Sequence, residues 1–182
     1  MRVWAVQPNK VASIRPALCE ILVDCVRDGA SVGFLDPLAV ADADGYWRRI
    51  ERAAAEGRCV LFAAALDGVD VTGTVQLDVD TLPNQPHRAT VSKLLVHTSS
   101  RRQGMGEALM AELERVALDR GRWLLTLDTA TGAAARLYER MGWSPAGTIP
   151  GYALNPDGTL TDTTFYWKQL SGGEAHEERR HG

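Results

Sequence analysis

A basic turn with two glycines carries the residues most able to do chemistry in this chain. It runs RRQGMG over residues 101–106, between a strand-like stretch (89–96) and a helix-like stretch that starts at Met105. A helix start exposes free backbone N–H groups and the positive end of the helix dipole, and both attract an anion. Gly104 and Gly106 lack the Cβ atoms that would hold a phosphate away from those N–H groups. The pattern predicts an anion site, although an ordinary basic strand-to-helix turn would have the same composition.

Two elements must position this turn. Residues 89–96 (ATVSKLLV) alternate and are rich in β-branched side chains, which predicts a strand. Downstream, apolar side chains recur at spacings of four, four and three residues, at Met105, Leu109, Leu113 and Val116. This spacing places them on one face of a helix. The turn is therefore expected to join a strand to a helix.

Two nucleotide-binding alternatives compete for the glycine turn. A P-loop needs Gly-Lys-Ser/Thr after the glycines, and Glu107 follows Gly106, so that motif is excluded. A dinucleotide fingerprint needs a third glycine where Leu109 stands, and a tight turn where seven residues (97–103) intervene. Asp128 ends the next predicted strand at about the distance of a ribose-binding acid. NAD binding therefore stays open as an alternative at this point.

The composition predicts one globular domain. The chain has 182 residues, of which 45% are hydrophobic and 24% charged, and we expect one domain over residues 1–170 with a disordered polar tail at 171–182. A net charge of −3 gives no support for nucleic-acid binding. Three cysteines without CxxC spacing, no signal peptide and no long apolar run predict a cytoplasmic protein away from membranes. His87 and His97 lack metal-ligand spacing, so no metal site is expected.

The order of predicted elements favours a mixed sheet. A strand at 3–7 precedes two helices, which end at Gly29 and Gly57. The later elements are strands at 59–66, 71–77 and 89–96, the helix after the turn, a strand at 123–128, a helix at 133–141 and closing strands at 148–149 and 163–167. Hairpin-joined strands followed by strand–helix–strand units predict an α/β fold. Its central sheet would be mixed and mostly antiparallel, with six to seven strands and helices on both faces.

Two motifs together resemble the GNAT (GCN5-related) N-acetyltransferase family. The pattern Arg101-x-x-Gly104-x-Gly106 after a strand is similar to that family's acyl-CoA pyrophosphate loop. Residues 134–143 (AARLYERMGW) are similar to its last helix and the exit from it. Gly106 and Tyr138 lie 32 residues apart, with a predicted helix and strand between them. Either motif alone is weak, whereas the pair at this spacing is specific.

The resemblance implies a GNAT-like acyl-CoA acyltransferase fold with splayed central strands and acetyl-CoA as cosubstrate. The strand before the turn would pair with the pantetheine arm through its backbone, and the turn would hold the pyrophosphate through its N–H groups. Arg101 and Arg102 suit the phosphate charges, and Arg101 occupies the motif position. The implied cosubstrate-binding residues are Leu95, Val96, Arg101, Arg102, Gln103, Gly104, Met105, Gly106, Glu107, Ala108 and Tyr138.

Acyl transfer from a thioester to an amine needs an acid for the leaving thiolate and a base for the ammonium. Tyr138 matches the family's tyrosine acid by position, and a phenol with a pKa near ~10 can protonate a thiolate whose thiol pKa is about 8.5. A core aromatic is the alternative role for Tyr138. Many relatives carry a glutamate base on the strand before the loop, where this chain has Thr90 and Ser92. Asp128 is the first candidate instead, and capping the following turn is its alternative role.

The acceptor site is predicted outside the cosubstrate motifs. Segments 29–34 (GASVGF) and 151–158 (GYALNPDG) suggest a subgroup that resembles tabtoxin-resistance acetyltransferases. That resemblance implies a small-molecule amine as acceptor, such as an amino-acid-like toxin or antibiotic. The predicted wall residues are Phe34, Trp47, Asp78, Asp128, Tyr152 and Trp167. A place in the core is the alternative for Trp47 and Trp167. A non-catalytic acyl-CoA sensor on the same scaffold and a homodimer both stay open.

Overall fold

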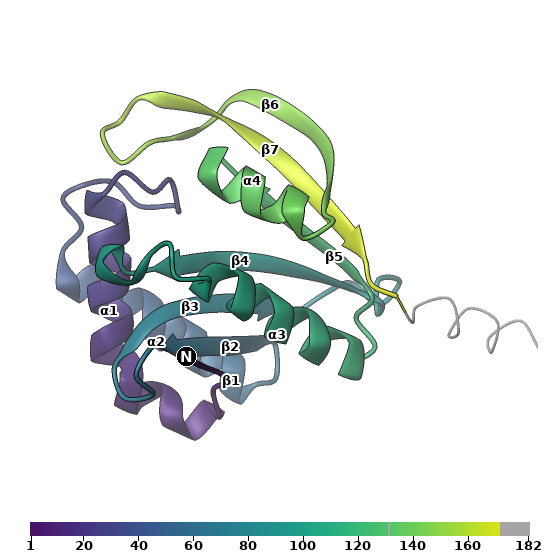
Figure 1. Cartoon of the computed structure of the whole chain (residues 1–182), viewed down its shortest axis with the longest axis horizontal. Coiled ribbons are helices and arrows are strands. Elements are labelled where there is room, and N and C mark those ends of the chain that lie inside the picture. Colours follow the sequence, from purple (N-terminus) through teal and green to yellow (C-terminus); the bar gives the residue numbers. More distant parts are fainter. Residues whose placement is uncertain (131, 172–182) are drawn as a thin grey trace, which may run out of the picture.

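A seven-stranded sheet forms the centre of the computed structural model, which describes residues 1–130 and 132–171 (Figure 1). The strand order is β1-β2-β3-β4-β5-β7-β6. β4 and β5 pair in parallel, and the other neighbouring strands pair antiparallel. The predicted α/β class with a mixed, mostly antiparallel sheet is confirmed.

The element bounds agree with the predicted order. The N-terminal part contains β1 (Arg2–Ala5), η1 (Pro8–Lys10), α1 (Val11–Arg27), α2 (Val40–Ala55), β2 (Cys59–Ala65), β3 (Val71–Asp78) and β4 (Arg88–Val96). The C-terminal part contains η2 (Thr98–Ser100), α3 (Met105–Asp119), β5 (Leu124–Thr129), α4 (Gly132–Arg140), β6 (Ser144–Leu154) and β7 (Leu160–Gln169). None of the described helices is long and apolar enough to cross a membrane.

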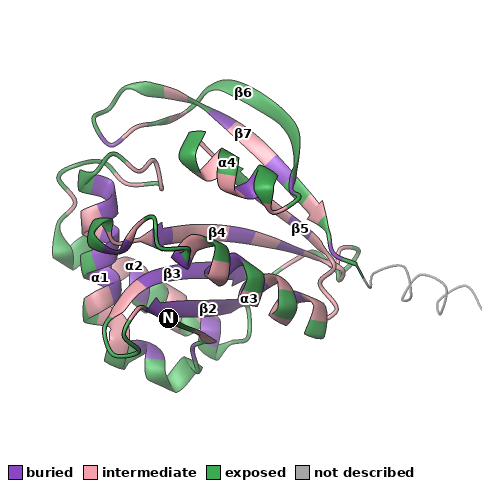
Figure 2. Cartoon of the chain, in the orientation of Figure 1, coloured by how far each residue is buried: buried purple, intermediate pink, exposed green. Residues whose placement is uncertain are grey.

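Helices cover both faces of the sheet, and β2 shows the effect most clearly. All seven of its residues are buried (Figure 2), which is why its sequence, CVLFAAA, is a continuous apolar run rather than an alternating one. Phe62 packs into the cluster beneath α3 and α4, whereas Leu61 packs into the cluster beneath α1 and α2. The two hydrophobic clusters therefore lie on opposite faces of one sheet.

The start of α3 is held against the sheet by a close helix–strand contact. A Cβ atom placed on Gly73 of β3 would lie 2.5 Å from Met105 Sδ and 3.2 Å from a methyl carbon of Leu109. Met105 is 2% exposed, so its side chain fills the space that the glycine leaves. The first residue of α3 is therefore positioned by the core.

The closing strands extend beyond their predicted bounds. β6 covers Ser144–Leu154 where residues 148–149 were expected, and β7 covers Leu160–Gln169 where 163–167 were expected. β6 is an edge strand with nearly every residue exposed (Figure 2), so no apolar alternation marks it in the sequence. The predicted tail at 171–182 lies outside the described residues apart from Ser171.

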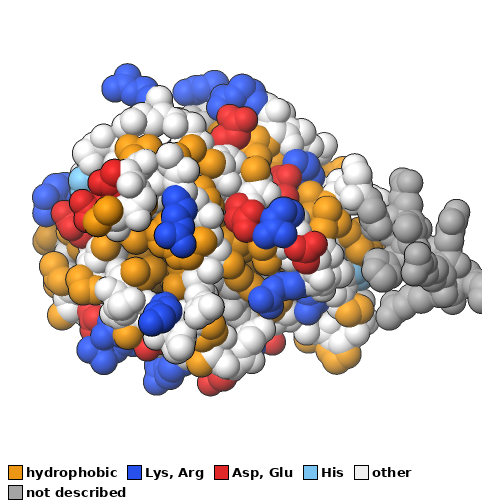
Figure 3. All heavy atoms as spheres, turned by 60° about the horizontal axis from the view of Figure 1, so that its bottom comes forward, with side chains coloured by type: hydrophobic (Ala, Val, Ile, Leu, Met, Phe, Trp, Pro, Cys, Tyr) orange, Lys and Arg blue, Asp and Glu red, His pale blue; other side chains and the backbone are white. Residues whose placement is uncertain are grey.

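Charged side chains are interspersed on the face drawn in Figure 3. Lys and Arg side chains alternate there with Asp and Glu around a central hydrophobic area, and they form no continuous basic stripe on that face. This face therefore carries charges of both signs close to one another.

The Gly73–Met105 contact yields the first prediction. Gly73→Ala forces Met105 to shift within a packed core, and we expect it to lower the free energy of unfolding by about 1–3 kcal/mol. Gly45→Ala in α2 is the matched control, because open space surrounds that position and alanine favours a helix by up to about 1 kcal/mol. Urea denaturation measures both variants. Equal midpoints for the two would contradict the packing argument.

Candidate active site

An opening between β4 and β5 forms the candidate site. The two strands pair only from Arg88–Thr90 on β4 to Leu124–Thr126 on β5. Beyond these residues β5 continues against β7, while β4 continues alone on that side. A cavity of about 590 Å³, here called the larger cavity, occupies the separation and reaches the start of α3 and the inner side of α4. The splayed central strands of the predicted fold are confirmed.

A second cavity of about 500 Å³, here called the smaller cavity, adjoins the larger one. Both are lined by Ser31, Val32, Val91, Ser92, Lys93 and Asp128. The remaining wall of the smaller cavity comes mainly from the loop after α1 and from β6, with Ala130 after β5 and Thr163 of β7. The two cavities therefore meet at the point where β4 and β5 diverge.

A β-bulge in β4 lies at this point of divergence. Ser92 pairs with Gln76 and Leu95 pairs with Thr74, so two residues of β4 oppose the single residue Val75 of β3. The first of them, Lys93, has φ 54°, in the left-handed region that side-chain-bearing residues rarely adopt. A bulge bends its strand and redirects side chains. It accounts for the turn of β4 away from β5.

The glycine turn presents N–H groups to the larger cavity. Arg102 and Gly104 both have left-handed backbone angles, φ 58° and 78°, and Gly104 is the N-cap of α3. Met105, Gly106 and Glu107 follow and line the cavity. Their N–H groups belong to the first turn of the helix, where no intrahelical acceptor is available. This end of the cavity can therefore bind an anion.

Two predicted members of the anion site contribute less than expected. Ala108 N–H donates to Gly104 O at 3.0 Å, so it is already engaged in the first turn of the helix. Gln103 and Ala108 are both absent from the described residues that line the cavity. Gly106 also has a packing role, since a Cβ there would lie 3.2 Å from a Leu137 methyl of α4. The absence of a side chain at position 106 therefore allows α4 to pack close to α3.

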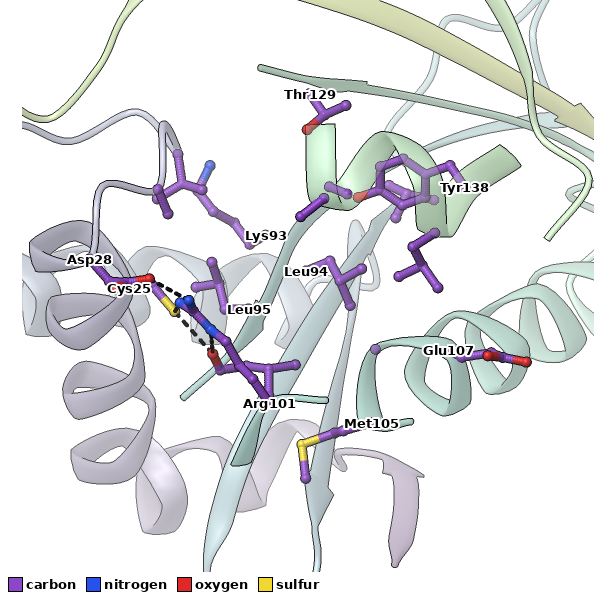
Figure 4. Close-up of a pocket in the computed structure, with 18 of the residues that line it drawn as sticks. Cys25, Asp28, Lys93, Leu94, Leu95, Arg101, Met105, Glu107, Thr129 and Tyr138 are labelled. Carbon is purple, nitrogen blue, oxygen red and sulfur yellow. Dashed lines mark hydrogen bonds and ion pairs between the residues drawn. The ribbon is translucent and has the colours of Figure 1, made fainter. Parts of the chain in front are cut away.

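The two arginines of the turn have different surroundings. Arg101 Nε donates to Val96 O at 3.1 Å, and its guanidinium pairs with Asp28 at the end of α1 and contacts Cys25 Sγ (Figure 4). Arg102 is exposed, lines the larger cavity and takes part in none of the ion pairs found among the described residues. The motif arginine, Arg101, is therefore held by contacts within the protein, whereas Arg102 faces the cavity.

The backbone of β4 is only partly available to a ligand. His97 N–H donates to Thr72 O at 2.8 Å, and Leu95 pairs with Thr74 in the same register. Because backbone groups alternate along an antiparallel ladder, Leu95 faces β3 and Val96 faces the open side. Leu95 is also 2% exposed. Of the two predicted arm-binding residues, only Val96 presents its backbone to the opening, and its carbonyl also accepts from Arg101.

Tyr138 projects from α4 into the larger cavity. Its ring contacts Trp143 and Tyr166, with ring centroids 5.9 Å apart in each case, and 6% of the residue is exposed. In Figure 4 the hydroxyl points into the cavity, towards the side where Lys93 and Leu94 lie. Burial raises the pKa of Tyr138 above its ordinary value, and the negative charge of Asp128 raises it further. The phenol is therefore protonated at neutral pH and can donate a proton.

Asp128 lies where the two cavities meet. It is an exposed residue near the end of β5, it pairs with Phe165 of β7, and it lines both cavities. Its charge raises the pKa of both Tyr138 and Lys93. A cationic group entering from the smaller cavity would meet this carboxylate before reaching Tyr138.

Two segments far apart in the sequence meet at the smaller cavity. Ser31 Oγ donates to Leu154 O at 3.0 Å, and Asp36 N–H donates to Pro156 O at 3.0 Å. Phe34 and Tyr152, both predicted wall residues, line this cavity. The loop after α1 and the β6–β7 hairpin therefore meet across it.

Three predicted wall residues lie elsewhere. Trp47 is fully buried in the cluster beneath α1 and α2, where it contacts the ring of Tyr46. Asp78 ends β3 opposite Cys59 and Thr90, and Trp167 of β7 pairs with Thr126 and Ser144. None of the three is among the described residues lining either cavity. Trp47 lies on the face of α2 that packs against the core, and this corrects its predicted position on the acceptor wall.

Lys93 is the site residue that the sequence did not indicate. It lines both cavities, and its ammonium lies 5.7 Å from the centre of the Tyr46 ring. Burial lowers the pKa of Lys93 from its ordinary value, while the charge of Asp128 acts in the opposite direction. A lysine inside a strand pattern carries no local sign of a bulge, so only the register of β3 and β4 reveals it.

Comparisons with known proteins agree with this geometry. A sequence profile of the "Acetyltransferase (GNAT) family" matches residues 16–143. An uncharacterized N-acetyltransferase from the hisH-hisA intergenic region of Azospirillum brasilense is 31% identical over 117 residues. That match covers 61% of this chain and 65% of the relative, so it spans less than two thirds of the relative's length.

Solved structures share the fold. A ribosomal-protein-alanine N-acetyltransferase from Brucella melitensis superposes with a TM-score of 0.76 at 22% identity, covering 93% of this chain and all of that one. A GNAT phosphinothricin acetyltransferase from Sinorhizobium meliloti, solved in complex with acetyl-CoA, has a TM-score of 0.74 at 19% identity, covering 96% of this chain and 90% of that one. With the family profile covering most of its length, the chain belongs to the GNAT acetyltransferase family.

Proposed function

We propose that the chain is an acetyl-CoA-dependent N-acetyltransferase that transfers the acetyl group directly to the amine of a small molecule. The observation that carries this proposal is the junction of the two cavities at Asp128. One cavity runs from an anion-binding helix start to Tyr138, and the other is lined in part by the loop after α1 and the β6–β7 hairpin. The expected acceptor class is an amino-acid-like toxin or antibiotic.

The larger cavity has the donors that acetyl-CoA needs. The first-turn N–H groups of Met105, Gly106 and Glu107 suit its pyrophosphate, and Arg102 and Arg140 line the same cavity as cations. The backbone of Val96 faces the open edge of β4, where an amide-bearing arm can pair with it. When bound, acetyl-CoA supplies an activated thioester with a thiol leaving group.

Tyr138 and Asp128 are the proposed catalytic residues. Tyr138 holds a proton at its hydroxyl over the neutral pH range, because burial and the charge of Asp128 raise its pKa. A departing thiolate can therefore be protonated there. Asp128 attracts the cationic amine and takes its proton, directly or through water, before attack. Thr90 is unsuited to this work, since its hydroxyl lies 3.3 Å from that of Thr126 across the strand pair.

The size of the smaller cavity supports a small acceptor. Ser31 and Asp36 bond to the β6–β7 hairpin on one side of a space of about 500 Å³. A volume of that size suits a small molecule. The names of the fold neighbours include both a ribosomal-protein-alanine and a phosphinothricin acetyltransferase, so this geometry, and not the neighbours, favours the small molecule.

We also infer that residues 1–170 form one domain and that the protein acts in the cytoplasm. The two hydrophobic clusters share a single sheet. Cys19, Cys25 and Cys59 are free and buried, as in proteins of reducing compartments. The sheet speaks against the NAD-binding alternative, because a dinucleotide fold is built on a mostly parallel sheet, whereas here β4 and β5 are parallel and the other neighbouring strands pair antiparallel.

The function is tested by ligand-induced thermal shifts and by thiol release. We expect acetyl-CoA and CoA, but not NAD, to raise the melting temperature, and thiol release to appear with members of an amine panel. Stabilisation by NAD and not by CoA would contradict the proposal. Stabilisation by acetyl-CoA without thiol release for any amine would support the non-catalytic sensor instead.

Substitution of Arg102 is expected to weaken acetyl-CoA binding, whereas substitution of Arg101 is expected to lower stability. Arg102→Ala removes a cation facing the cavity, so the Kd for acetyl-CoA should rise about tenfold, and less at high salt, with unfolding unchanged within about 0.5 kcal/mol. Arg101→Ala leaves Val96 O and Asp28 without this partner and should destabilise the fold by about 1 kcal/mol. Calorimetric titration and urea denaturation measure the two effects. The reverse pattern would return the phosphate role to Arg101.

Tyr138→Phe should lower kcat by about 100-fold or more with little change in the KM for acetyl-CoA. The substitution keeps the ring contacts with Trp143 and Tyr166, so the fold is preserved while the proton donor is lost. Because the pKa of Tyr138 is raised, the parent enzyme loses no activity through this group up to about pH 9. Steady-state kinetics over this pH range is the measurement. A turnover within about twofold of the parent's would show that Tyr138 is not the acid.

A further inference from the structure

The smaller cavity has one charge of each sign. Among the described residues that line it, Lys93 and Asp128 are the charged ones, and most of the others are apolar or small. Lys93 comes from the bulge of β4 and Asp128 from the end of β5, so the two charges sit on the two strands that diverge. Opposite charges in an otherwise uncharged wall indicate a ligand that carries both signs.

Within residues 1–130 and 132–171, Lys93 has no carboxylate partner of its own. It takes part in none of the ion pairs between described residues, each of which has N···O within 4.0 Å. Its ammonium lies 5.7 Å from the Tyr46 ring centre, and a Cβ on Gly33 would be 4.0 Å from it. The Tyr46 hydroxyl is itself occupied, since it donates to Gln76 Oε1 at 2.9 Å. The cation is therefore directed towards the loop after α1, at the wall of the smaller cavity.

A partly buried ammonium of this kind is costly to keep charged. Removing it from water is unfavourable unless an anion or hydrogen-bond acceptors replace the water. The lowered pKa of Lys93 expresses the same cost. The face of the Tyr46 ring offsets part of it through a cation–π contact. A carboxylate bound beside Lys93 would offset the rest.

We propose that Lys93 is a specificity-determining residue that binds the carboxylate of a zwitterionic amino-acid acceptor, while Asp128 receives the ammonium of the same molecule. This inference rests on the proposed function and narrows its substrate class. The acceptor lies in the smaller cavity with its amine at the junction with the larger one. Its side chain contacts the apolar wall formed by residues such as Val32, Phe34 and Leu154.

The placement of the two charges fixes the orientation of the acceptor. Asp128 lines both cavities, whereas Tyr138 lines the larger one and the Lys93 ammonium lies near Gly33 on the wall of the smaller one. An amine held at Asp128 is next to the cavity that ends at Tyr138. A carboxylate held at Lys93 lies on the side of Gly33 and Tyr46, away from the start of α3. A reversed molecule would place like charges together.

The test compares apolar L-amino acids with their carboxamides, which keep the amine and the side chain and lose the negative charge. Alanine, leucine, methionine and phenylalanine and their amides are assayed by thiol release with the parent, Lys93→Gln and Lys93→Arg. The ratio of kcat/KM between variant and parent is taken for each acceptor separately, which cancels the difference in amine basicity between acid and amide. Binding of the same compounds to the CoA complex is measured by calorimetric titration.

Two controls keep backbone and folding effects apart from charge. Gln and Arg stand at the same left-handed position of the bulge, so any backbone strain is common to both variants. Lys10→Gln makes the same chemical change at an exposed lysine of η1, outside both cavities. Thermal unfolding of each variant verifies that the fold is intact.

We expect Lys93→Gln to lose at least about tenfold more kcat/KM and affinity on the amino acids than on their amides, and Lys93→Arg to recover most of that loss. Equal losses on acids and amides would overturn the carboxylate role and assign Lys93 to the chemistry itself. Acetylation of plain amines with no binding of any amino acid would also overturn it. If acetyl-CoA does not bind the parent, the proposed function itself is wrong. The thermal-shift measurements test that binding independently of Lys93.

Discussion

The parallel pairing of β4 with β5 stops after three residue pairs, and the site depends on the opening that this leaves. A strand edge inside a protein must satisfy its N–H and C=O groups. Here Arg101 satisfies the carbonyl of Val96 from the protein itself, and the rest of the edge is available to a ligand with amides. The bulge at Lys93 keeps β4 separated from β5, because the register shift of the bulge is fixed by the pairing of β4 with β3.

Three contacts hold the surrounding elements in position. Gly73 receives Met105, Gly106 receives Leu137, and Asp28 pairs with Arg101. Each joins a segment of the glycine turn to a different neighbour: β3, α4 and α1 in that order. The turn is thus fixed on three sides while the first-turn N–H groups of α3 stay directed at the cavity. Binding at such a turn requires little reorganisation, since the donors are already aligned.

Local sequence patterns predicted the features of the site that depend on neighbouring residues in the chain. The glycine turn was predicted because the backbone geometry it needs, φ 78° at Gly104, selects glycine directly. The sequence favoured Arg101 over Arg102 for the phosphates, and it gave no sign of the Arg101–Asp28 pair because Asp28 lies 73 residues away. Trp47 was misplaced because helical spacing does not tell which face of α2 meets the core. Lys93 was missed because a bulge is defined by the register of two strands and not by one.

The charges of the acceptor site follow from the same bulge. On β4, the Thr90 hydroxyl lies 3.3 Å from that of Thr126, and the bulge directs a lysine, Lys93, to the cavities. The carboxylate at the junction comes from β5, as Asp128. With the cation on β4 and the anion on β5, the electrostatic field across the smaller cavity has a direction. In the acceptor orientation that we propose, this field draws the ammonium towards Asp128 on β5 and away from Lys93 on β4. The proposal thus assigns both the cosubstrate site and the orientation of the acceptor to one break in strand pairing.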